Sequence, residues 1–306
     1  MIGGAPGSFA SASYNLTMTD TLIRFDFENA AIRGEVVRLE DAWQTICSHR
    51  DYPAPVCVVL GELTAASALL AASLKFEGSV ALQLQGAGPL RLAVAEARDT
   101  LSVRATAEWG DLGAAQGLAA LLGRGTFSVV LDSSAGEPYQ GIVPVDSDAV
   151  GPALEGYMAR SQQIPTRLLL AADAGAACGL LLQRLPDQTS HDVDAWERIG
   201  ALAATLGRDE LLANAPETLL RRLFHEETLR VYEPRKPAFG CRCSVQRVEG
   251  MLRMIGRDEV DSIISEHGEV KVDCEFCNQS YRFDANGVAA VFAAGGNLFQ
   301  GTPTRH

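Results

Sequence analysis

Short runs in which apolar and polar residues alternate dominate the first part of the chain and predict a sheet-rich domain. Residues 81–85 alternate with a period of two, and residues 90–95 form a mostly apolar run. A turn at 86–89 that contains glycine and proline separates them, so they predict two neighbouring strands. Residues 127–132 form a compact apolar run, which predicts a further strand, and residues 141–145 predict another.

The stretch that follows adds a helix and another pair of strands. Residues 150–161 carry apolar positions at helical spacing, and Pro165 ends the pattern. Residues 167–172 and 178–183 predict a strand pair around the turn at 173–175. Strands come in adjacent pairs more often than in strict alternation with helices, which favours an α+β domain over a doubly wound sheet. We therefore expect an N-terminal mixed α/β-sheet domain over residues 1–185.

Residues 186–234 are expected to form a helical linker that is richer in charge. From 191 to 233 there are nine acidic and five basic residues, which is 14 of 43, whereas charged residues make up 21% of the whole chain. Helices this short and polar depend on what they pack against. Two interpretations stay open, a conditional element between two domains or a well-solvated linker. The apolar stripes of the segment are formed by Leu211, Leu212, Leu219, Leu220, Leu223 and Phe224.

Residues 235–306 are expected to form a small cysteine-containing domain with a C-terminal tail. The pattern predicts two short helices within 245–266, divided near Gly256, and a strand at 280–283. The part that can fold, up to about residue 286, has only about 50 residues. A core of that size contributes little by itself, so a bound metal should supply most of the folding free energy. The predicted fold class is thus α+β, with a helical linker and a four-cysteine zinc domain.

Composition and charge narrow the possible functions. The chain has 306 residues, a hydrophobic fraction of 47%, a net charge of -12 and a pI of about 4.9. An acidic protein is a poor candidate for binding nucleic acid. The start of the chain has no secretory signal pattern, and the most apolar stretch, 64–74, is expected to be too short to span a membrane. We expect a cytoplasmic protein, where the cysteines stay reduced.

Four of the seven cysteines, Cys241, Cys243, Cys274 and Cys277, fall within 37 consecutive residues. They form a C-x-C and a C-x-x-C pair separated by 30 residues, and two close pairs of this kind are what a tetrahedral zinc ion needs. Thiolates are also the form of cysteine that oxidants attack, and an oxidised sulfur finds its nearest partner in the same turn. The spacing alone leaves two interpretations open, a permanent structural zinc site or a zinc-held redox switch.

Several stretches carry a resemblance to a known family. Around the cysteines these are F-G-C-R-C-S at 239–244, G-R-D-E-V-D-S-I-I-S-E-H-G-E-V at 256–270 and C-E-F-C-N-Q-S-Y-R-F at 274–283. Further stretches are L-F-H-E-E-T-L-R-V-Y at 223–232, Q-G-A-G-P at 85–89, Y-Q-G at 139–141 and S-Q-Q-I-P-T-R at 161–167. Together they resemble the heat-shock protein 33 family, the redox-regulated holdase chaperones of bacteria. The chain departs from the family's pattern at Gly156, at Gln162 and at residues 104–106, where Arg-Ala-Thr replaces a glycine-containing stretch.

The resemblance implies a function and a mechanism. The reduced protein would hold one zinc ion through the four cysteines and be inactive. Peroxide or hypochlorite would form the bridges Cys241–Cys243 and Cys274–Cys277, zinc would leave, and the small domain would unfold. The activated protein would bind unfolding client proteins in the stress response without ATP and without enzymatic activity, and activation is expected to favour a homodimer. The expected partners include neither nucleic acid nor membrane.

Two rival functions are weighed against this one. A nucleic-acid-binding zinc ribbon is disfavoured because residues 235–286 carry eight basic and nine acidic residues. A thiol-disulfide oxidoreductase using C-E-F-C is also disfavoured. That motif normally follows a strand and opens a helix, whereas here a second cysteine pair precedes it and a predicted strand at 280–283 follows it. Among the other candidate residues, His225 lacks the second histidine of a metalloprotease motif, and His267 is expected at the surface. The remaining cysteines, Cys47, Cys57 and Cys178, are expected to be small buried hydrophobic residues.

Overall fold

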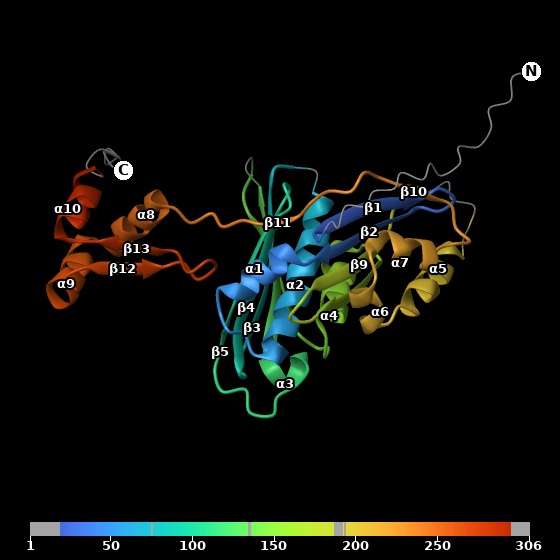
Figure 1. Cartoon of the computed structure of the whole chain (residues 1–306), viewed down its shortest axis with the longest axis horizontal. Coiled ribbons are helices and arrows are strands. Elements are labelled where there is room, and N and C mark those ends of the chain that lie inside the picture. The colour runs from blue at the N-terminus through green and yellow to red at the C-terminus, as the bar shows by residue number, and fades with distance from the viewer. Residues whose placement is uncertain (1–18, 75, 134–135, 187–191, 193, 295–306) are drawn as a thin grey trace, which may run out of the picture.

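The structure is a computed structural model that describes residues 19–74, 76–133, 136–186, 192 and 194–294. A larger body carries two sheets with helices between and beside them, and a smaller body lies at one end of an extended connection (Figure 1). The expectations that concern the first 18 residues, residue 191 and the C-terminal tail from 295 lie outside the described residues.

The first sheet has five strands in the order β10-β1-β2-β9-β8, and every neighbouring pair is antiparallel. Its strands β8 and β9 are the strand pair that the sequence predicted around the turn at 173–175. The short strand β10 comes from the linker and extends this sheet at its edge beside β1. The strands are β1 (Thr21–Phe27), β2 (Ile32–Leu39), β8 (Thr166–Ala172), β9 (Ala177–Arg184) and β10 (Leu229–Val231).

The second sheet has six strands in the order β11-β5-β4-β3-β6-β7. It is antiparallel except at its edge, where β11 pairs in parallel with β5. The strands expected at 81–85, 90–95, 127–132 and 141–145 fall on β3, β4, β6 and β7. The strands are β3 (Gly78–Gly86), β4 (Leu90–Arg98), β5 (Ser102–Trp109), β6 (Gly125–Ser133), β7 (Tyr139–Pro144) and β11 (Ala238–Phe239).

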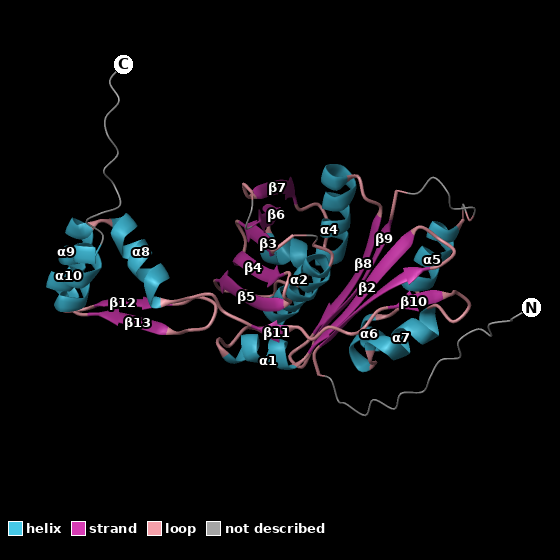
Figure 2. Cartoon of the chain, turned by 90° about the horizontal axis from the view of Figure 1, so that it is seen from above, coloured by secondary structure: helices cyan, strands magenta, loops and turns pink. Residues whose placement is uncertain are grey.

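One long helix, α2 (Ala54–Ala72), lies between the two sheets and contacts strands of both (Figure 2). This helix corrects an expectation from the sequence, because its 19 residues are long and apolar enough to cross a membrane. The stretch 64–74 is only its second half, so the length argument was wrong. The helix is apolar because it lies inside the protein, where 78% of its apolar window is buried. The apolar residues of α2 form the core that joins the two sheets.

The helices of the linker cover the opposite face of the first sheet. Side chains alternate along a strand, so β1 directs Leu22 into the core around α2 and the neighbouring residues Ile23 and Phe25 into a second core. Phe224 of the linker closes that second core, with its ring 5.1 Å from Phe27 and 6.0 Å from Phe25. The linker therefore packs as part of the larger body. Its helices are α5 (Ala195–Ala204), α6 (Arg208–Ala213) and α7 (Pro216–Leu223).

Three further helices complete the larger body. Helix α1 (Asp41–Ser48) precedes α2, and α3 (Leu118–Leu122) packs beside β3 and β4. The helix expected at 150–161 is α4 (Val150–Tyr157), which continues into a wider turn at Met158–Gln162. That turn ends at Gln163, whose φ of 54° places it in the left-handed region and stops the helix before Pro165.

The smaller body, which we call the C-terminal module, comprises residues 241–294. Its helices α8 (Val245–Ile255) and α9 (Arg257–His267) divide at Gly256, as predicted, where φ is 100°. The hairpin of β12 (Val270–Asp273) and β13 (Ser280–Phe283) follows, and then α10 (Ala285–Ala294). The fold class is thus confirmed as α+β. Residues 238–239 pair with the larger body, and the boundaries 1–185, 186–234 and 235–306 remain a prediction.

Candidate metal centre

The first cysteine pair lies on the stretch that leaves β11. The amides of Ala238 and Gly240 donate to the carbonyls of Leu101 and Val103 at 3.1 and 3.0 Å, which binds this stretch to β5. A Cβ atom on Gly240 would stand 2.1 Å from the Oγ of Ser102, so the stretch lies directly against β5 at this point. The C-x-C turn therefore starts from a fixed point on the larger body.

The residues after this turn fix its other end. Ser244 follows the second cysteine and is the N-cap of α8, where its Oγ accepts a hydrogen bond from the amide of Arg247 at 3.3 Å. The first cysteine pair is thus held between a strand of the larger body and a helix of the C-terminal module. One short turn connects the two bodies and carries two of the four sulfurs.

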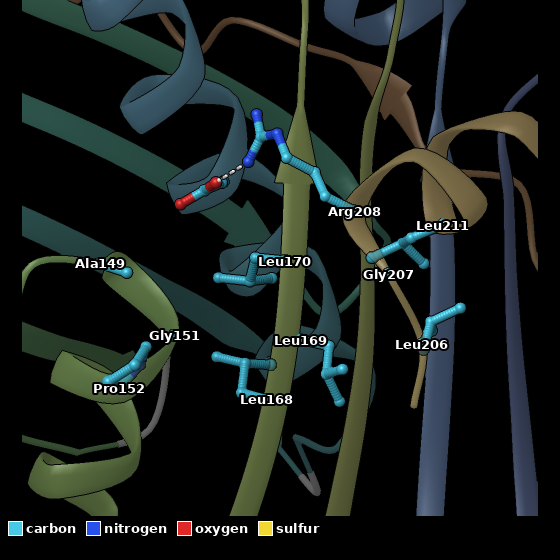
Figure 3. Close-up of a pocket in the computed structure, with 11 residues that line it drawn as sticks. Ala149, Gly151, Pro152, Leu168, Leu169, Leu170, Leu206, Gly207, Arg208 and Leu211 are labelled. Atoms are coloured by element: carbon cyan, nitrogen blue, oxygen red, sulfur yellow. Dashed lines mark hydrogen bonds and ion pairs between the residues drawn. The ribbon is translucent and has the colours of Figure 1, made fainter. Parts of the chain in front are cut away.

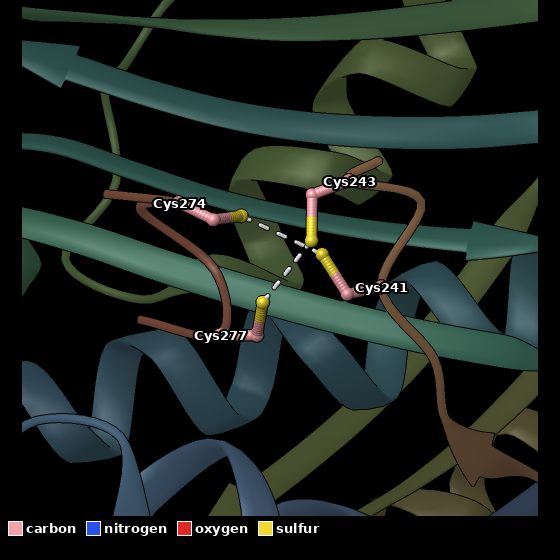
Figure 4. Close-up of side chains that lie close together, drawn as sticks. All are labelled: Cys241, Cys243, Cys274 and Cys277. Atoms are coloured by element: carbon pink, nitrogen blue, oxygen red, sulfur yellow. Dashed lines mark hydrogen bonds between the residues drawn. The ribbon is translucent and has the colours of Figure 1, made fainter. Parts of the chain in front are cut away.

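The second cysteine pair lies in the loop that joins β12 to β13. The Cys274 amide donates to the carbonyl of Gln279 at 3.0 Å, and the Asn278 amide donates to the carbonyl of Cys274 at 2.8 Å. Asn278 adopts a left-handed conformation with a φ of 54°, which asparagine tolerates better than most residues. These bonds curl the loop so that Cys274 and Cys277 face the first pair (Figure 4).

The structure brings all four predicted cysteine residues together. Their sulfur atoms all lie within 4.8 Å of one another (Figure 4). The Sγ atoms of Cys241 and Cys274 are 3.6 Å apart, and those of Cys243 and Cys277 are 3.3 Å apart. Tetrahedral zinc with bonds of about 2.3 Å would place its sulfur ligands about 3.8 Å apart. The cluster could therefore hold a metal ion, and its size and its sulfur donors are consistent with zinc.

The pKa values of Cys241, Cys274 and Cys277 are shifted in different directions. Burial opposes ionisation of Cys241, but the backbone amide of Cys243 and the neighbouring thiols donate hydrogen bonds that outweigh it and lower the Cys241 pKa to about 7. Burial raises the pKa of Cys274 and of Cys277. A hydrogen bond with the Cys243 sulfur raises the pKa of Tyr281 to about 12. Without a cation, one thiolate is stabilised by its neighbours, and the positive charge of a metal would be needed to keep all four ionised.

The cluster also contacts the larger body through four pairs of residues, which we call the docking contact. The pairs are Arg50 with Glu275, the carbonyl of His49 with Asn278, Arg104 with Phe276, and Glu96 with Arg242. Sequence reasoning missed these contacts because their partners lie far apart in the chain, for example 225 residues for the first pair. The one indication was the replacement of a glycine-containing stretch by Arg-Ala-Thr at 104–106.

The other residues singled out from the sequence lie apart from the cluster. Cys178 and Cys57 are buried, as expected, whereas Cys47 is only half-buried. His267 is exposed at the end of α9, as predicted, and His225 is exposed beside the carbonyl of Arg222. Among the described residues, the four-cysteine cluster is the only group of three or more cysteine, histidine or acidic side chains close enough to share a metal ion.

A second feature that sequence reasoning missed is a pocket where the linker meets the first sheet (Figure 3). Leucines of β8 line it, with the start of α4 on one side of the strand and Leu206 and Leu211 of the linker on the other. Arg208 reaches across and pairs with Glu62 of α2 at 2.7 Å, and it also donates to the carbonyl of Ala172. The carboxylate of Glu62 is almost entirely buried, and burial raises its pKa although Arg208 lowers it. This ion pair ties the linker to the central helix.

Comparison with known proteins places the chain in a family. The sequence model described as "Hsp33 protein" matches residues 20–284. A protein named 33 kDa chaperonin from Chromobacterium violaceum is 45% identical over 284 residues, which covers 91% of this chain and 95% of that protein. A 33 kDa chaperonin from Methylobacillus flagellatus is 44% identical over 272 residues, covering 88% of this chain and 93% of that protein.

A solved structure agrees with the fold. The crystal structure of a 33 kDa chaperonin, a heat shock protein 33 homologue from Thermotoga maritima, superposes with a TM-score of 0.79. The superposition covers 90% of this chain and 98% of the Thermotoga maritima chain, and the two sequences are 23% identical. At that level of identity the similarity concerns the fold alone. The match of the family model and the similarity to the curated relatives extend over most of the chain, and together they show that it belongs to the Hsp33 family.

Proposed function

We propose that this protein is a redox-regulated holdase, a chaperone that needs no ATP and catalyses no reaction, and that it works in the reducing cytoplasm. Membership of a family whose relatives are named chaperonins supports chaperone activity. The observation that carries the redox proposal is the cluster of four sulfurs within 4.8 Å of one another, at the junction of the two bodies. Cys241, Cys243, Cys274 and Cys277 would hold one zinc ion in the reduced, inactive form.

Oxidation of the cysteines is the proposed signal. One hydrogen peroxide accepts two electrons from a pair of thiolates, which forms one S–S bond and releases two hydroxide ions. Two peroxide molecules therefore convert four thiolates into two disulfides and four hydroxide ions. Disulfide sulfurs no longer carry the charge that binds the cation, so the metal is lost. The proposed bridges are Cys241–Cys243 and Cys274–Cys277.

Loss of the metal is expected to unfold the C-terminal module. Structural zinc contributes on the order of 10–16 kcal/mol in small domains, which is comparable to the whole stability of an average domain. The core of the module is small, with seven buried apolar residues among those described: Val248, Leu252, Val260, Val270, Phe283, Val288 and Val291. Burial of that size does not compensate for the loss of the metal.

Undocking of the linker would then provide a surface for client proteins. The leucines of α6 and α7 pack against β1 and β8, so their release would expose apolar side chains on both partners. Contiguous apolar surface of this kind binds unfolded polypeptide. We propose that unfolding proteins bind there and that the activated form assembles as a homodimer. Neither a nucleic acid nor a membrane takes part in the proposed function.

The test is the light scattering of a heat-denaturing protein, measured with this chain either reduced and zinc-loaded or treated with hydrogen peroxide. We expect the oxidised form to suppress aggregation and the reduced form to leave it unchanged. A Cys274→Ser variant is the matched control for the role of the metal site. Suppression by both forms of the wild type, or by neither, would contradict regulation by oxidation.

The pairing of the cysteines needs a separate measurement. Two sulfur contacts of the cluster, 3.6 Å between Cys241 and Cys274 and 3.3 Å between Cys243 and Cys277, run between the two turns rather than within them. Disulfides within each turn would nevertheless form first if the turns separate once the metal leaves. Peptide mapping by mass spectrometry after peroxide treatment identifies the bridges. A dominant Cys241–Cys274 or Cys243–Cys277 bridge would show that the turns stay together during oxidation.

A further inference from the structure

Arg104 of β5 is the residue of the larger body that reaches the cysteine cluster most directly. Its side chain is 13% exposed, and its guanidinium carbon lies 4.2 Å from the ring centre of Phe276. Phe276 stands between the two cysteines of the second pair. The Cys241 thiol of the first pair also lies close enough to this guanidinium group for the two to interact electrostatically. One side chain of the larger body thus contacts both cysteine turns.

A buried carboxylate holds this guanidinium in place. The Nε atom of Arg104 donates to Glu96 Oε2 at 3.0 Å, and Nη2 of Arg104 donates to the same oxygen. The other oxygen of Glu96 pairs with Arg242, the residue between the two cysteines of the first pair. Glu96 therefore lies between two guanidinium groups, one from each body. With a side chain only 8% exposed, it forms a more persistent partner than a solvated carboxylate would.

The charges of this arrangement favour a metal-bound cluster. Four thiolates around a divalent cation carry a local charge of minus two. Arg104 and Arg242 together contribute two positive charges, and Glu96 contributes one negative charge, so the immediate surroundings carry a net positive charge of about one at half-buried positions. Two neutral disulfides would carry no negative charge to attract Arg104.

We propose that Arg104 is a positioning residue that holds the four-cysteine cluster against the larger body in the reduced state and releases it when the cluster loses its charge. This role deepens the proposed function and rests on the four cysteines holding zinc. The guanidinium would act in two ways, through its contact with the ring of Phe276 and through its attraction to the thiolates. Oxidation by two peroxide molecules removes the thiolate charges, as described above, and so weakens the second attraction at the moment when the loop carrying Phe276 changes shape.

A neighbouring pair shows why this contact differs from an ordinary surface ion pair. Arg91 and Glu108, on β4 and β5 of the same sheet, are 3.6 Å apart, but their side chains are 64% and 62% exposed. Pairs of that kind contribute little because water and salt screen them. Arg91→Ala therefore serves as the matched control, since it removes an arginine from the same sheet without touching the cluster.

The experiment measures amide hydrogen exchange at Ala238 and Gly240 in the reduced, zinc-loaded protein, because these amides bond to β5 beside the cluster. We expect Arg104→Ala to speed this exchange about tenfold, which corresponds to about 1.4 kcal/mol. Release of zinc by peroxide, followed with a colorimetric chelator, should quicken in the same variant. Arg104→Lys, which keeps the charge but not the planar group, should restore part of the wild-type protection.

The results of this experiment distinguish failure of the positioning role from failure of the proposed function. Arg104→Ala with one zinc per chain, wild-type exchange and wild-type zinc release would overturn the positioning role and leave the metal site standing. Failure of the wild type to bind zinc would instead contradict the proposed function. If Arg104→Ala lowers the Tm of the larger body itself, Phe276→Leu decides the question. It removes the contact from the module side, so wild-type exchange in that variant would also overturn the proposal.

Discussion

The larger body and the C-terminal module belong to one chain but are stabilised in different ways. The larger body has two cores, and its largest side chains, such as Trp43 and Tyr157, are fully buried. The module has one small core, and its helix α8 leaves apolar side chains in solvent, with Met254 83% exposed and Ile255 47% exposed. The difference indicates that burial stabilises the larger body, whereas the proposed function assigns much of the module's stability to a metal ion.

This division suits the proposed switch, in which an event at four sulfurs would unfold one part of the chain and leave the other folded. The linker lies between these extremes. It shares a core with the first sheet through Phe224, yet its helices are short and exposed on their outer faces. Its structure depends on docking rather than on helix propensity. The predictions that follow test this gradation, from the largest expected effect to the smallest.

Removing the metal should have the largest effect. A strong chelator under reducing conditions should unfold residues 241–284, because the metal contributes on the order of 10–16 kcal/mol in such domains. The Tm of the larger body should change little. Calorimetry and elemental analysis of the same sample check both statements, and reduced wild-type protein should contain one zinc per chain.

Cys274→Ser provides the genetic version of that experiment, and Cys178→Ser provides the control. Cys274 is one of the four clustered sulfurs, whereas Cys178 is buried in the first sheet far from them. The first variant should lose zinc and the folded module. Stoichiometric zinc with a folded module in Cys274→Ser would show that the cluster is not the metal site.

The same substitution in the two cores should have different consequences. Leu63 of α2 is fully buried between the sheets, and Leu252 of α8 is 1% exposed in the module. Leu63→Ala should lower the free energy of unfolding of the larger body by about 2–5 kcal/mol. Leu252→Ala should leave that free energy unchanged and should instead weaken the apparent zinc affinity, because folding of the module and metal binding are coupled. Denaturant titration and zinc competition measure the two effects, and a lowered larger-body stability in Leu252→Ala would contradict the division.

The smallest effect should come from the linker's ion pair. Arg208→Ala leaves the buried carboxylate of Glu62 without its partner, which should weaken docking of the linker by about 1–2 kcal/mol. Arg222→Ala is the matched control, since Arg222 is exposed and lies 3.3 Å from Glu210. Limited proteolysis of the reduced protein should cut the linker faster in the first variant only, and equal rates in both variants would contradict a role for the ion pair.

The pH dependence of that variant follows from the pKa of Glu62. Burial raises this pKa in the docked state, so the Glu62 carboxyl holds its proton more tightly when the linker is docked than an exposed carboxyl does. The proton-linked contribution to docking is present at low pH and is lost as pH rises through the raised pKa. Cleavage of the Arg208→Ala linker should therefore slow as the solution is made more acidic.

Much of the fold could be predicted from the sequence because local patterns of residues determine it. The strands β3, β4, β6, β8 and β9 follow from alternation and from turns, and the division of α8 from α9 follows from Gly256. The four-cysteine cluster was predictable because the spacing of ligands along the chain limits how a tetrahedral site forms. In the strands and helices the determining interactions lie within a few residues of one another, and in the cluster each cysteine pair does.

The rest depends on contacts between distant residues. Strands β10 and β11 have only three and two residues, too few to show a periodic pattern, and they exist because a sheet edge is available to pair with. Helix α2 is apolar on all sides because both of its faces meet a sheet, which its sequence alone cannot distinguish from a membrane span. The contacts of Arg104 and Arg208 join segments that only the tertiary fold brings together.

Hydrogen exchange before and after peroxide treatment tests the central claim most directly. The claim is that oxidation unfolds the C-terminal module and releases the linker while the rest of the larger body stays folded. Protection should therefore fall across residues 194–233 and 241–284 and persist in buried strands such as β6. A uniform rise in exchange through the whole chain, or a rise confined to the larger body outside the linker, would contradict the account even if the zinc assignment held.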